Sequence, residues 1–304
     1  MRFRSLRSRL LVAIGVLVVA LTGATLTYVG RLAGQAVTER VSADLVHSRE
    51  TLANVQTARY ERLTLVARLL VSFPDLLALL GTDGATIRDF LTDYRERNAR
   101  EELLLVLDQR GAVIARSDTF APFVLPDAAP RWIEPAMAAR PAHGVVMVDG
   151  RPHHLVLVPA EAGGTVFGFV AAAAPIDDRW ASALRDASGK EIALLTATGL
   201  AGTTLAPGRL PWANAAAFGT ASDATRAVDL GGERFEAVSV ADPHDAAVRI
   251  VALQSLDLAL APYRNIQVGL VLLGVVAAAV GLAAAFLLAR SITAPIAELS
   301  RATV

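Results

Sequence analysis

The chain has 304 residues, 54% of them hydrophobic and 19% charged, and its mean hydropathy of +0.46 requires either lipid or a very large core to accommodate the apolar side chains. It contains no cysteine, which excludes a disulfide scaffold and any thiolate zinc or iron–sulfur site. Its 29 basic residues balance 29 acidic ones, which excludes a nucleic-acid-binding protein driven by bulk positive charge.

Two long apolar stretches divide the chain. Residues 10–29 carry no charged side chain, and residues 266–289 are interrupted only by Gln267. Each can cross a bilayer core of about 30 Å, which takes about 20 helical residues. A cleavable signal peptide is the alternative for the first stretch, but its apolar run exceeds the usual length of about 7–15 residues. The sequence therefore predicts two transmembrane helices.

The charges flanking these spans predict their orientation. Residues 1–9 hold four arginines, and Arg290 and Arg301 follow the second span. The segment between the spans, residues 31–265, holds 23 basic and 28 acidic residues. Because positive residues are retained on the cytoplasmic side, both ends are predicted to be cytoplasmic and the long middle segment extracytoplasmic. The expected location is therefore a cell membrane, with a multi-pass topology.

The middle segment begins with a predicted stalk, residues 34–80. Between Gly34 and Val71 there is neither a proline nor a further glycine, and apolar residues recur close to every 3.5 positions. This pattern predicts one long helix that continues the first span. Pro74 then starts a short helix, because proline is tolerated in a first helical turn.

A module of alternating apolar residues follows, at residues 82–187. It opens with a helix up to about residue 100, and a short helix at 132–139 lies between its second and third strands. Asp149-Gly150 is a two-residue turn signal, which predicts that strands 144–148 and 153–159 form a hairpin. The other strands are predicted at residues 103–108, 112–117 and 165–173.

The same plan then repeats in a shorter module, residues 188–254. Strands are predicted at 191–196, 203–206, 225–230, 234–240 and 247–254, with a small helix at 212–218. A helix at 256–265 leads into the second span. The expected fold is α+β: two tandem antiparallel-sheet modules on a long N-terminal helix, flanked by two transmembrane helices.

This order of elements resembles the double Cache extracytoplasmic sensor domains of bacterial transmembrane receptors. The most similar segments are LLLVLDQRGAVIARSD at residues 103–118 and VFGFVAAAAPIDD at residues 166–178. The resemblance implies PAS-like modules, the first membrane-distal and the second membrane-proximal. In the second span, Ala277, Gly281 and Ala285 recur every four residues, which permits close helix packing and predicts a homodimer.

Residues 290–304 resemble the start of a HAMP linker, which relays motion from a span to a cytoplasmic output domain. The match rests on Pro295 and Glu298, and Ile292, Ile296 and Leu299 have the 4-then-3 spacing of a coiled-coil seam. Such a linker needs a second helix. We therefore expect this polypeptide to be the sensory part of a longer receptor.

Catalytic chemistry has no visible basis in the sequence. The chain contains no G-x-S-x-G, H-E-x-x-H, Walker A or G-x-G-x-x-G motif, and no cofactor is expected. His143, His153 and His154 lie close together in the sequence and are therefore candidate metal ligands. If Asp149-Gly150 is the turn, His143 and His154 share one sheet face and His153 faces the other, so a three-histidine site is not expected.

A ligand pocket is implied by the resemblance, in the cleft between the first sheet and its small helix. The polar and aromatic candidates there are Arg116, Asp118, Arg131, Trp132 and His154. An arginine suits carboxylate recognition and a tryptophan can stack on a ligand. The alternatives are solvated arginines and a core tryptophan. The Arg-x-Trp-Tyr pattern of amino-acid-binding Cache receptors is not matched, so amino-acid sensing is not supported.

The predicted function is the sensory input of a bacterial membrane receptor, with a small-molecule ligand, a lipid bilayer and a second copy of the chain as partners. The ligand would shift a conformational equilibrium that reaches a cytoplasmic output. A histidine kinase is the first expectation for that output, with a nucleotide cyclase or a chemoreceptor as alternatives. A membrane-tethered extracytoplasmic enzyme and a structural protein are the alternatives of another class.

Overall fold

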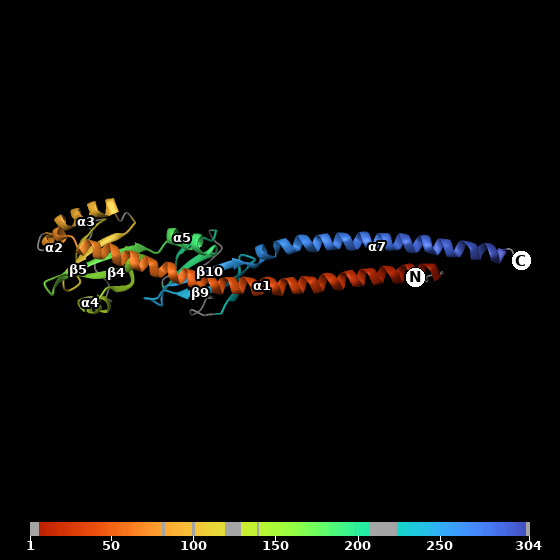
Figure 1. Cartoon of the computed structure of the whole chain (residues 1–304), viewed down its shortest axis with the longest axis horizontal. Helices are drawn as coiled ribbons and strands as arrows, with labels where there is room; N and C mark the ends of the chain where they lie inside the picture. Colours follow the sequence, from red (N-terminus) through yellow and green to blue (C-terminus); the bar gives the residue numbers. More distant parts are fainter. Residues whose placement is uncertain are drawn as a thin grey trace. The chain divides into compact units, whose positions relative to one another are not determined.

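A computed structural model of the chain describes residues 6–80, 83–98, 101–118, 129–138, 140–197, 199–206 and 224–301 (Figure 1). The chain divides into two compact units. One comprises Met1–Val41 with Ser255–Val304, and the other comprises Ser42–Gln254. We call the second unit the head and describe each unit by itself.

The first unit consists of long helices. Helix α1 (Leu6–Val71) begins in it and α7 (Leu256–Arg301) completes it. Within the described residues, segments of both helices are long and apolar enough to cross a membrane, and these segments are not buried. The two helices touch at Gly274, where an added Cβ would lie 2.6 Å from Cγ2 of Thr22.

The predicted long N-terminal helix is confirmed, because α1 has no break between the first apolar stretch and Val71. Helix α7 starts directly after the last strand, so the helix predicted at 256–265 and the second apolar stretch form one helix. This helix runs on through Pro295. The five relay residues expected between 290 and 304 all lie in this last part of α7, and their side chains lie outside the described set.

The first sheet of the head is antiparallel with strand order β2-β1-β5-β4-β3. Its strands are β1 (Leu103–Leu107), β2 (Val113–Arg116), β3 (Ala142–Val148), β4 (Arg151–Ala162) and β5 (Thr165–Pro175). Its helices are α2 (Pro74–Leu79), α3 (Gly84–Asn98) and α4 (Ala129–Met137). The turn at Asp149 and Gly150 has positive φ angles of 50° and 77°, as a two-residue hairpin turn requires.

The two faces of this sheet are covered by different helices. Because side chains alternate along a strand, β1 sends Leu104 and Val106 to one face and Leu105 to the other. The first face packs against α1, α2 and α3. The second packs against α4, through Trp132 and neighbouring apolar residues. Figure 1 shows α4 on the side of β4 and β5 opposite to α3.

The second sheet repeats the topology, with strand order β7-β6-β10-β9-β8. Its strands are β6 (Glu191–Thr196), β7 (Gly199–Thr203), β8 (Arg226–Leu230), β9 (Glu233–Ala241) and β10 (Arg249–Ser255), and α5 (Asp178–Ser188) precedes them. The strand expected at 203–206 is wrong: β7 begins earlier because Gly199 pairs with Thr196 across a tight turn. The helix expected at 212–218 lies outside the described residues.

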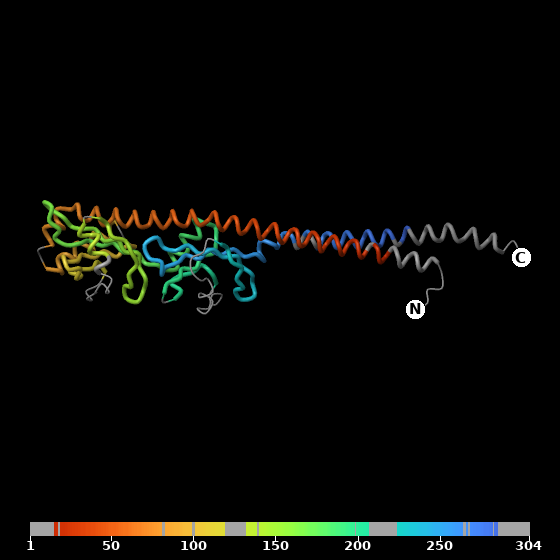
Figure 2. The backbone as a smooth tube through the Cα atoms, turned by 90° about the horizontal axis from the view of Figure 1, so that it is seen from below, coloured from red at the N-terminus to blue at the C-terminus, as the bar shows by residue number. Residues whose placement is uncertain are grey.

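Helix α1 binds to both sheets within the head. Its C-terminal part packs on the first sheet through residues such as Leu63 and Leu70. Earlier on the helix, Ser42 bonds the hydroxyl of Thr225, and Asp44 pairs with Lys190. Figure 2 shows this helix running beside both groups of strands. The head is therefore held together by one helix that contacts two modules.

Candidate ligand pocket and the junction between the modules

Arg116 stands at the end of β2 in a pocket of about 400 Å³, which we call the Arg116 pocket. Its side chain is 3% exposed and is held by two carboxylates. Nε and Nη2 donate to Asp118 at 2.7 and 2.9 Å, and Nη2 donates to Asp149 at 2.8 Å. The rim carries both signs of charge: Arg95, Glu101, Arg151 and His153.

The charge of Arg116 is balanced within the pocket by the carboxylates of Asp118 and Asp149. The hydrogen bond to Asp118 raises the pKa of Arg116, against the opposing effect of burial. The hydrogen bond from Arg116 lowers the pKa of Asp149. Arg116 and Asp118 share a strand face, as the alternation predicted, but the guanidinium donates to these neighbours. A ligand carboxylate would have to displace Asp118 or Asp149 to reach it.

Trp132 and Arg131 both lie on α4. The Trp132 ring is 6% exposed and packs into the core beneath α4. Its fit depends on Gly144 of β3, because a Cβ there would lie 2.5 Å from Nε1 of the indole. The space between the sheet and this helix is therefore filled by a tryptophan and is not an open cleft. The side chain of Arg131 lies outside the described residues.

His154 lies on the other face of the sheet. The predicted hairpin register is confirmed: Val145 pairs with His154 and Val146 with His153. His154 also pairs with Ala174, which packs toward α1, whereas Arg116 pairs with Leu105, which packs toward α4. The expectation that His154 shares a cleft with Arg116 and Trp132 is therefore wrong, because strand alternation places it on the opposite side.

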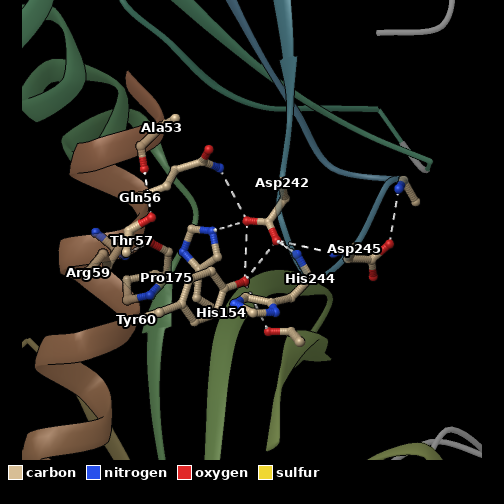
Figure 3. A network of polar contacts seen from close by, with 12 residues as sticks. Ala53, Gln56, Thr57, Arg59, Tyr60, His154, Pro175, Asp242, His244 and Asp245 are labelled. Atoms are coloured by element: carbon tan, nitrogen blue, oxygen red, sulfur yellow. Dashed lines mark hydrogen bonds and ion pairs between the residues drawn. The ribbon is translucent and has the colours of Figure 1, made fainter. Parts of the chain in front are cut away.

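A carboxylate of the second module meets His154 there (Figure 3). The side chains of His154 and Asp242 are 1% and 0% exposed, with Nε2 and Oδ2 3.2 Å apart. From α1, Gln56 donates to Oδ2 at 3.2 Å, and the hydroxyl of Tyr60 lies 3.1 and 3.2 Å from the two oxygens. Backbone N–H groups at His244 and Asp245 also donate to Oδ1. We call this set the junction network: Gln56, Tyr60, His154, Asp242 and His244.

The junction network stabilises a buried anion. Burial alone would raise the pKa of Asp242, but His154, the backbone of His244 and the hydroxyl of Tyr60 outweigh it, so the pKa lies below its ordinary value. Burial lowers the pKa of His154, although Asp242 opposes this. Burial and Asp242 raise the pKa of Tyr60. The favoured state is an ionised carboxylate among neutral donors.

One further histidine, His143, stacks on His244 of the network. His143 and His244 stack with ring centroids 4.6 Å apart and planes 18° apart, and the edge of Tyr60 meets both rings. Burial, followed by the nearby His244, lowers the pKa of His143. His153 points to the opposite side, into the Arg116 pocket, as the register predicted. Among the described residues, no group of three or more potential ligands is placed to hold a metal.

Sequence reasoning missed Asp242, Tyr60, Gln56 and His244. The one local signal is an aspartate placed directly after the apolar strand β9. Its partners lie about 88 and 182 residues away along the chain, so no spacing rule joins them.

We compared the chain with known proteins by sequence and by structure. No sequence model of a known family matches the chain, and no curated protein matches it. The extracellular domain of vpHK1S-Z8, a candidate histidine kinase, gives a TM-score of 0.52 at 14% identity, over 75% of this chain and 96% of that one. The ligand-binding domain of the Campylobacter jejuni chemoreceptor Tlp3, in complex with 4-methylisoleucine, gives 0.47 at 13% identity, over 75% and 94%. A sensory box/GGDEF family domain from Vibrio parahaemolyticus gives 0.47 at 13%, over 72% and 97%. The match at a TM-score of 0.52 confirms the expected α+β fold.

Proposed function

We propose that the chain is the sensory input part of a membrane-anchored receptor, whose head binds a small solute outside the cytoplasm. The observation that carries this proposal is the fold: the head shares its double-sheet architecture with the extracellular domain of a candidate histidine kinase, at a TM-score of 0.52. Apolar helices long enough to cross a bilayer adjoin that head on both sides along the chain. A folded domain between two such helices is the arrangement of a transmembrane sensor.

The proposed topology puts both chain ends in the cytoplasm and the head outside a bacterial inner membrane. Six basic residues and one acidic residue flank the two spans, whereas the head side is net acidic. A fluorescent protein fused after Val304 tests this, because it fluoresces only if it remains cytoplasmic. Alkaline phosphatase at the same position is the matched control. Phosphatase activity there would overturn the receptor topology.

The solute is proposed to bind in the Arg116 pocket. Its walls present guanidinium groups and carboxylates to solvent within one cavity, which suits a small polar solute that carries both donors and acceptors. Asp118 and Arg131 remain candidates beside Arg116. In this proposal Trp132 supports α4 from the core, and His154 belongs to the junction network, where it connects the modules instead of touching the solute.

The signal is proposed to leave through α7 of a homodimer. The relay residues are those of the HAMP-like segment: Ile292, Pro295, Ile296, Glu298 and Leu299. Binding that favours one of two dimer conformations by about 1–3 kcal/mol suffices to shift their populations. A histidine kinase is the proposed output, with a nucleotide cyclase or a chemoreceptor as alternatives, and the sequence following residue 304 decides among them.

The ligand proposal is tested by a thermal-shift screen of small polar solutes against the 304-residue chain in detergent. A ligand at 100 times its Kd adds about 2.7 kcal/mol of stability, enough to move Tm by several degrees. The shift is expected to vanish in Arg116→Gln and to persist in Arg97→Gln, which alters an exposed arginine on α3. A shift that persists in Arg116→Gln would place the site elsewhere.

A further inference from the structure

We propose a second binding site next to the Arg116 pocket: a cavity between α1 and α5 that takes a small oxyanion carrying a hydroxyl group, on Arg59. The two cavities share Glu101, Glu102 and Pro175, whereas Arg59 lines only this one and Arg116 only the other. The cavity has a volume of about 570 Å³. Its walls come from α1, from the end of β5 and from the first turns of α5. The inference goes beyond the proposed sensory function and does not depend on a ligand at Arg116.

Arg59 is a cation fixed in place without a counterion in contact. Its Nη2 donates to the backbone oxygen of Pro175 at 2.6 Å, and its guanidinium lies 3.9 Å from the centre of the Trp180 ring. Among the described residues, no carboxylate lies within ion-pair distance of it, and its Nε is buried with no acceptor. The side chain is half-buried, and a buried donor such as this Nε is costly unless an acceptor pairs with it.

The carboxylates of the cavity are engaged elsewhere. Glu102 pairs with Arg62 at 2.8 Å, and Asp177 accepts the N–H of Trp180 as the N-cap of α5. Glu101 is exposed. Burial lowers the pKa of Arg59 to about 10, with Asp177 and Glu102 acting against it through space. Arg59 therefore remains charged at neutral pH, and Arg179, on the exposed side of α5, adds a second cation to the same wall.

Glu102 adds a requirement for a donor on the ligand. One of its oxygens bonds Arg62, while the other, Oε2, is buried with no donor. Both residues line the cavity. In the proposed complex their side chains turn toward the ligand, so that the oxygens of an oxyanion accept from Arg59 and its hydroxyl donates to Glu102. Hydrogen phosphate and hydroxycarboxylates share this chemistry, whereas acetate and chloride lack the hydroxyl.

The site contacts the junction network through one side chain. The Trp180 ring that carries Arg59 on its face meets His154 edge to face, with centroids 6.1 Å apart and planes 84° apart. His154 in turn faces Asp242. An anion on Arg59 therefore sits two side chains away from the contact between the modules.

The test is calorimetric titration of the full chain in detergent with sodium phosphate, glycolate, acetate and chloride at constant ionic strength. Saturable 1:1 binding is expected for phosphate or glycolate or both, with acetate at least about tenfold weaker. The comparison of the first two separates a phosphate site from a hydroxycarboxylate site. Equal response to all four anions, or no saturable binding, would overturn the proposal.

Variants locate the site. Arg59→Gln is expected to weaken binding at least about tenfold, and Arg59→Lys, which keeps the charge but loses Nε, is expected to weaken it less. Arg97→Gln is the matched surface control. Binding that is unchanged in a folded Arg59→Gln chain contradicts the proposal.

A measurement on the unaltered site covers the case in which Arg59→Gln fails to fold. With 5-fluorotryptophan incorporated, the ¹⁹F signal assigned by Trp180→Phe should shift on phosphate addition while that of Trp132 stays fixed. A fixed Trp180 signal at saturation would overturn the assignment. Arg116→Gln should retain the response, so that failure of the Arg116 pocket and failure of this site remain distinguishable.

Discussion

Each face of the first sheet carries a cluster of buried apolar side chains, but the polar groups beside the two clusters differ. Under α4 the sheet packs apolar side chains around Trp132, with Arg116 and its two carboxylates at the rim. Under α1 the apolar core ends at the junction network, where His154 meets a carboxylate of the other module. The apolar face fixes one local helix, whereas the polar face joins three segments that are distant in sequence. Burial alone therefore does not distinguish the face that holds one local helix from the face that joins the two modules.

Truncating the apolar face has the largest expected effect. Trp132→Ala removes a buried indole that fits against Gly144 and should cost about 3–5 kcal/mol of unfolding free energy, because the cavity cannot collapse fully. Urea unfolding of the full chain, followed by circular dichroism, measures it. Trp132→Phe is the control and should cost clearly less. Equal losses in the two variants would show that the indole is not packed as described.

Neutralising the polar face comes next. Asp242→Asn keeps the shape but replaces an acceptor oxygen by an amino group that faces the donors of Gln56 and Tyr60, so a loss of about 2–3 kcal/mol is expected in the same measurement. Asp245→Asn is the nearby control, since among the described residues the Asp245 side chain accepts a hydrogen bond only from the N–H of Ala247, while the hydrogen bond from its backbone N–H to Asp242 is unchanged. A loss at Asp242 no larger than at Asp245 would contradict the junction network.

A smaller effect is expected at the hydroxyl of Tyr60. Tyr60→Phe removes one donor to Asp242 while the ring contacts remain, and it should cost about 1 kcal/mol. Tyr94→Phe on α3 is the matched control, because its hydroxyl has no hydrogen-bond partner among the described residues. In the background of Asp242→Asn the Tyr60 effect should shrink, since a double-mutant cycle measures their coupling.

The smallest expected effect is the pH dependence of the unfolding free energy, to which the polar face contributes through His154 and Asp242. Burial lowers the pKa of His154 below its ordinary value of 6.5, so the unfolded chain binds more protons and stability falls as the pH drops below about 6.5. Asp242 acts in the same direction at lower pH, because its lowered pKa adds stability that is lost as the carboxylate is protonated below about 3.8. Unfolding at pH 7 and pH 5 tests this.

His154→Gln should flatten that slope between pH 7 and pH 5, whereas the exposed His47→Gln should leave it unchanged. His143 and His153 also contribute, since burial lowers the pKa of both. A slope that is the same in His154→Gln and the wild type would assign the dependence to His143 and His153 instead.

Local features of the sequence predicted local features of the fold. Asp149-Gly150 gave the hairpin register, and from it the opposite orientations of His153 and His154, because a two-residue turn fixes every pair that follows. The absence of proline and of a further glycine after Gly34 gave the long helix. Strand β7 was misplaced because its glycine-rich sequence has poor strand propensity and is held by pairing with β6.

The candidate site was less predictable because it depends on which helix covers which face. The expected cleft combined residues from both sides of the sheet, although alternation already separates His154 from Arg116. The partners of His154 lie in another module, and no pattern within β9 indicates that its terminal aspartate is buried. Long-range packing, not propensity, decided these contacts.

The hydrogen bonds from α1 to Asp242 limit rotation of that helix about its own axis. Gln56 and Tyr60 stand four residues apart, so they lie on the same side of the helix and reach one carboxylate together. A step of one residue rotates a helix by about 100°, which would withdraw both side chains at once. A turn of α1 about its own axis must therefore break both hydrogen bonds to Asp242 together, rather than one after the other.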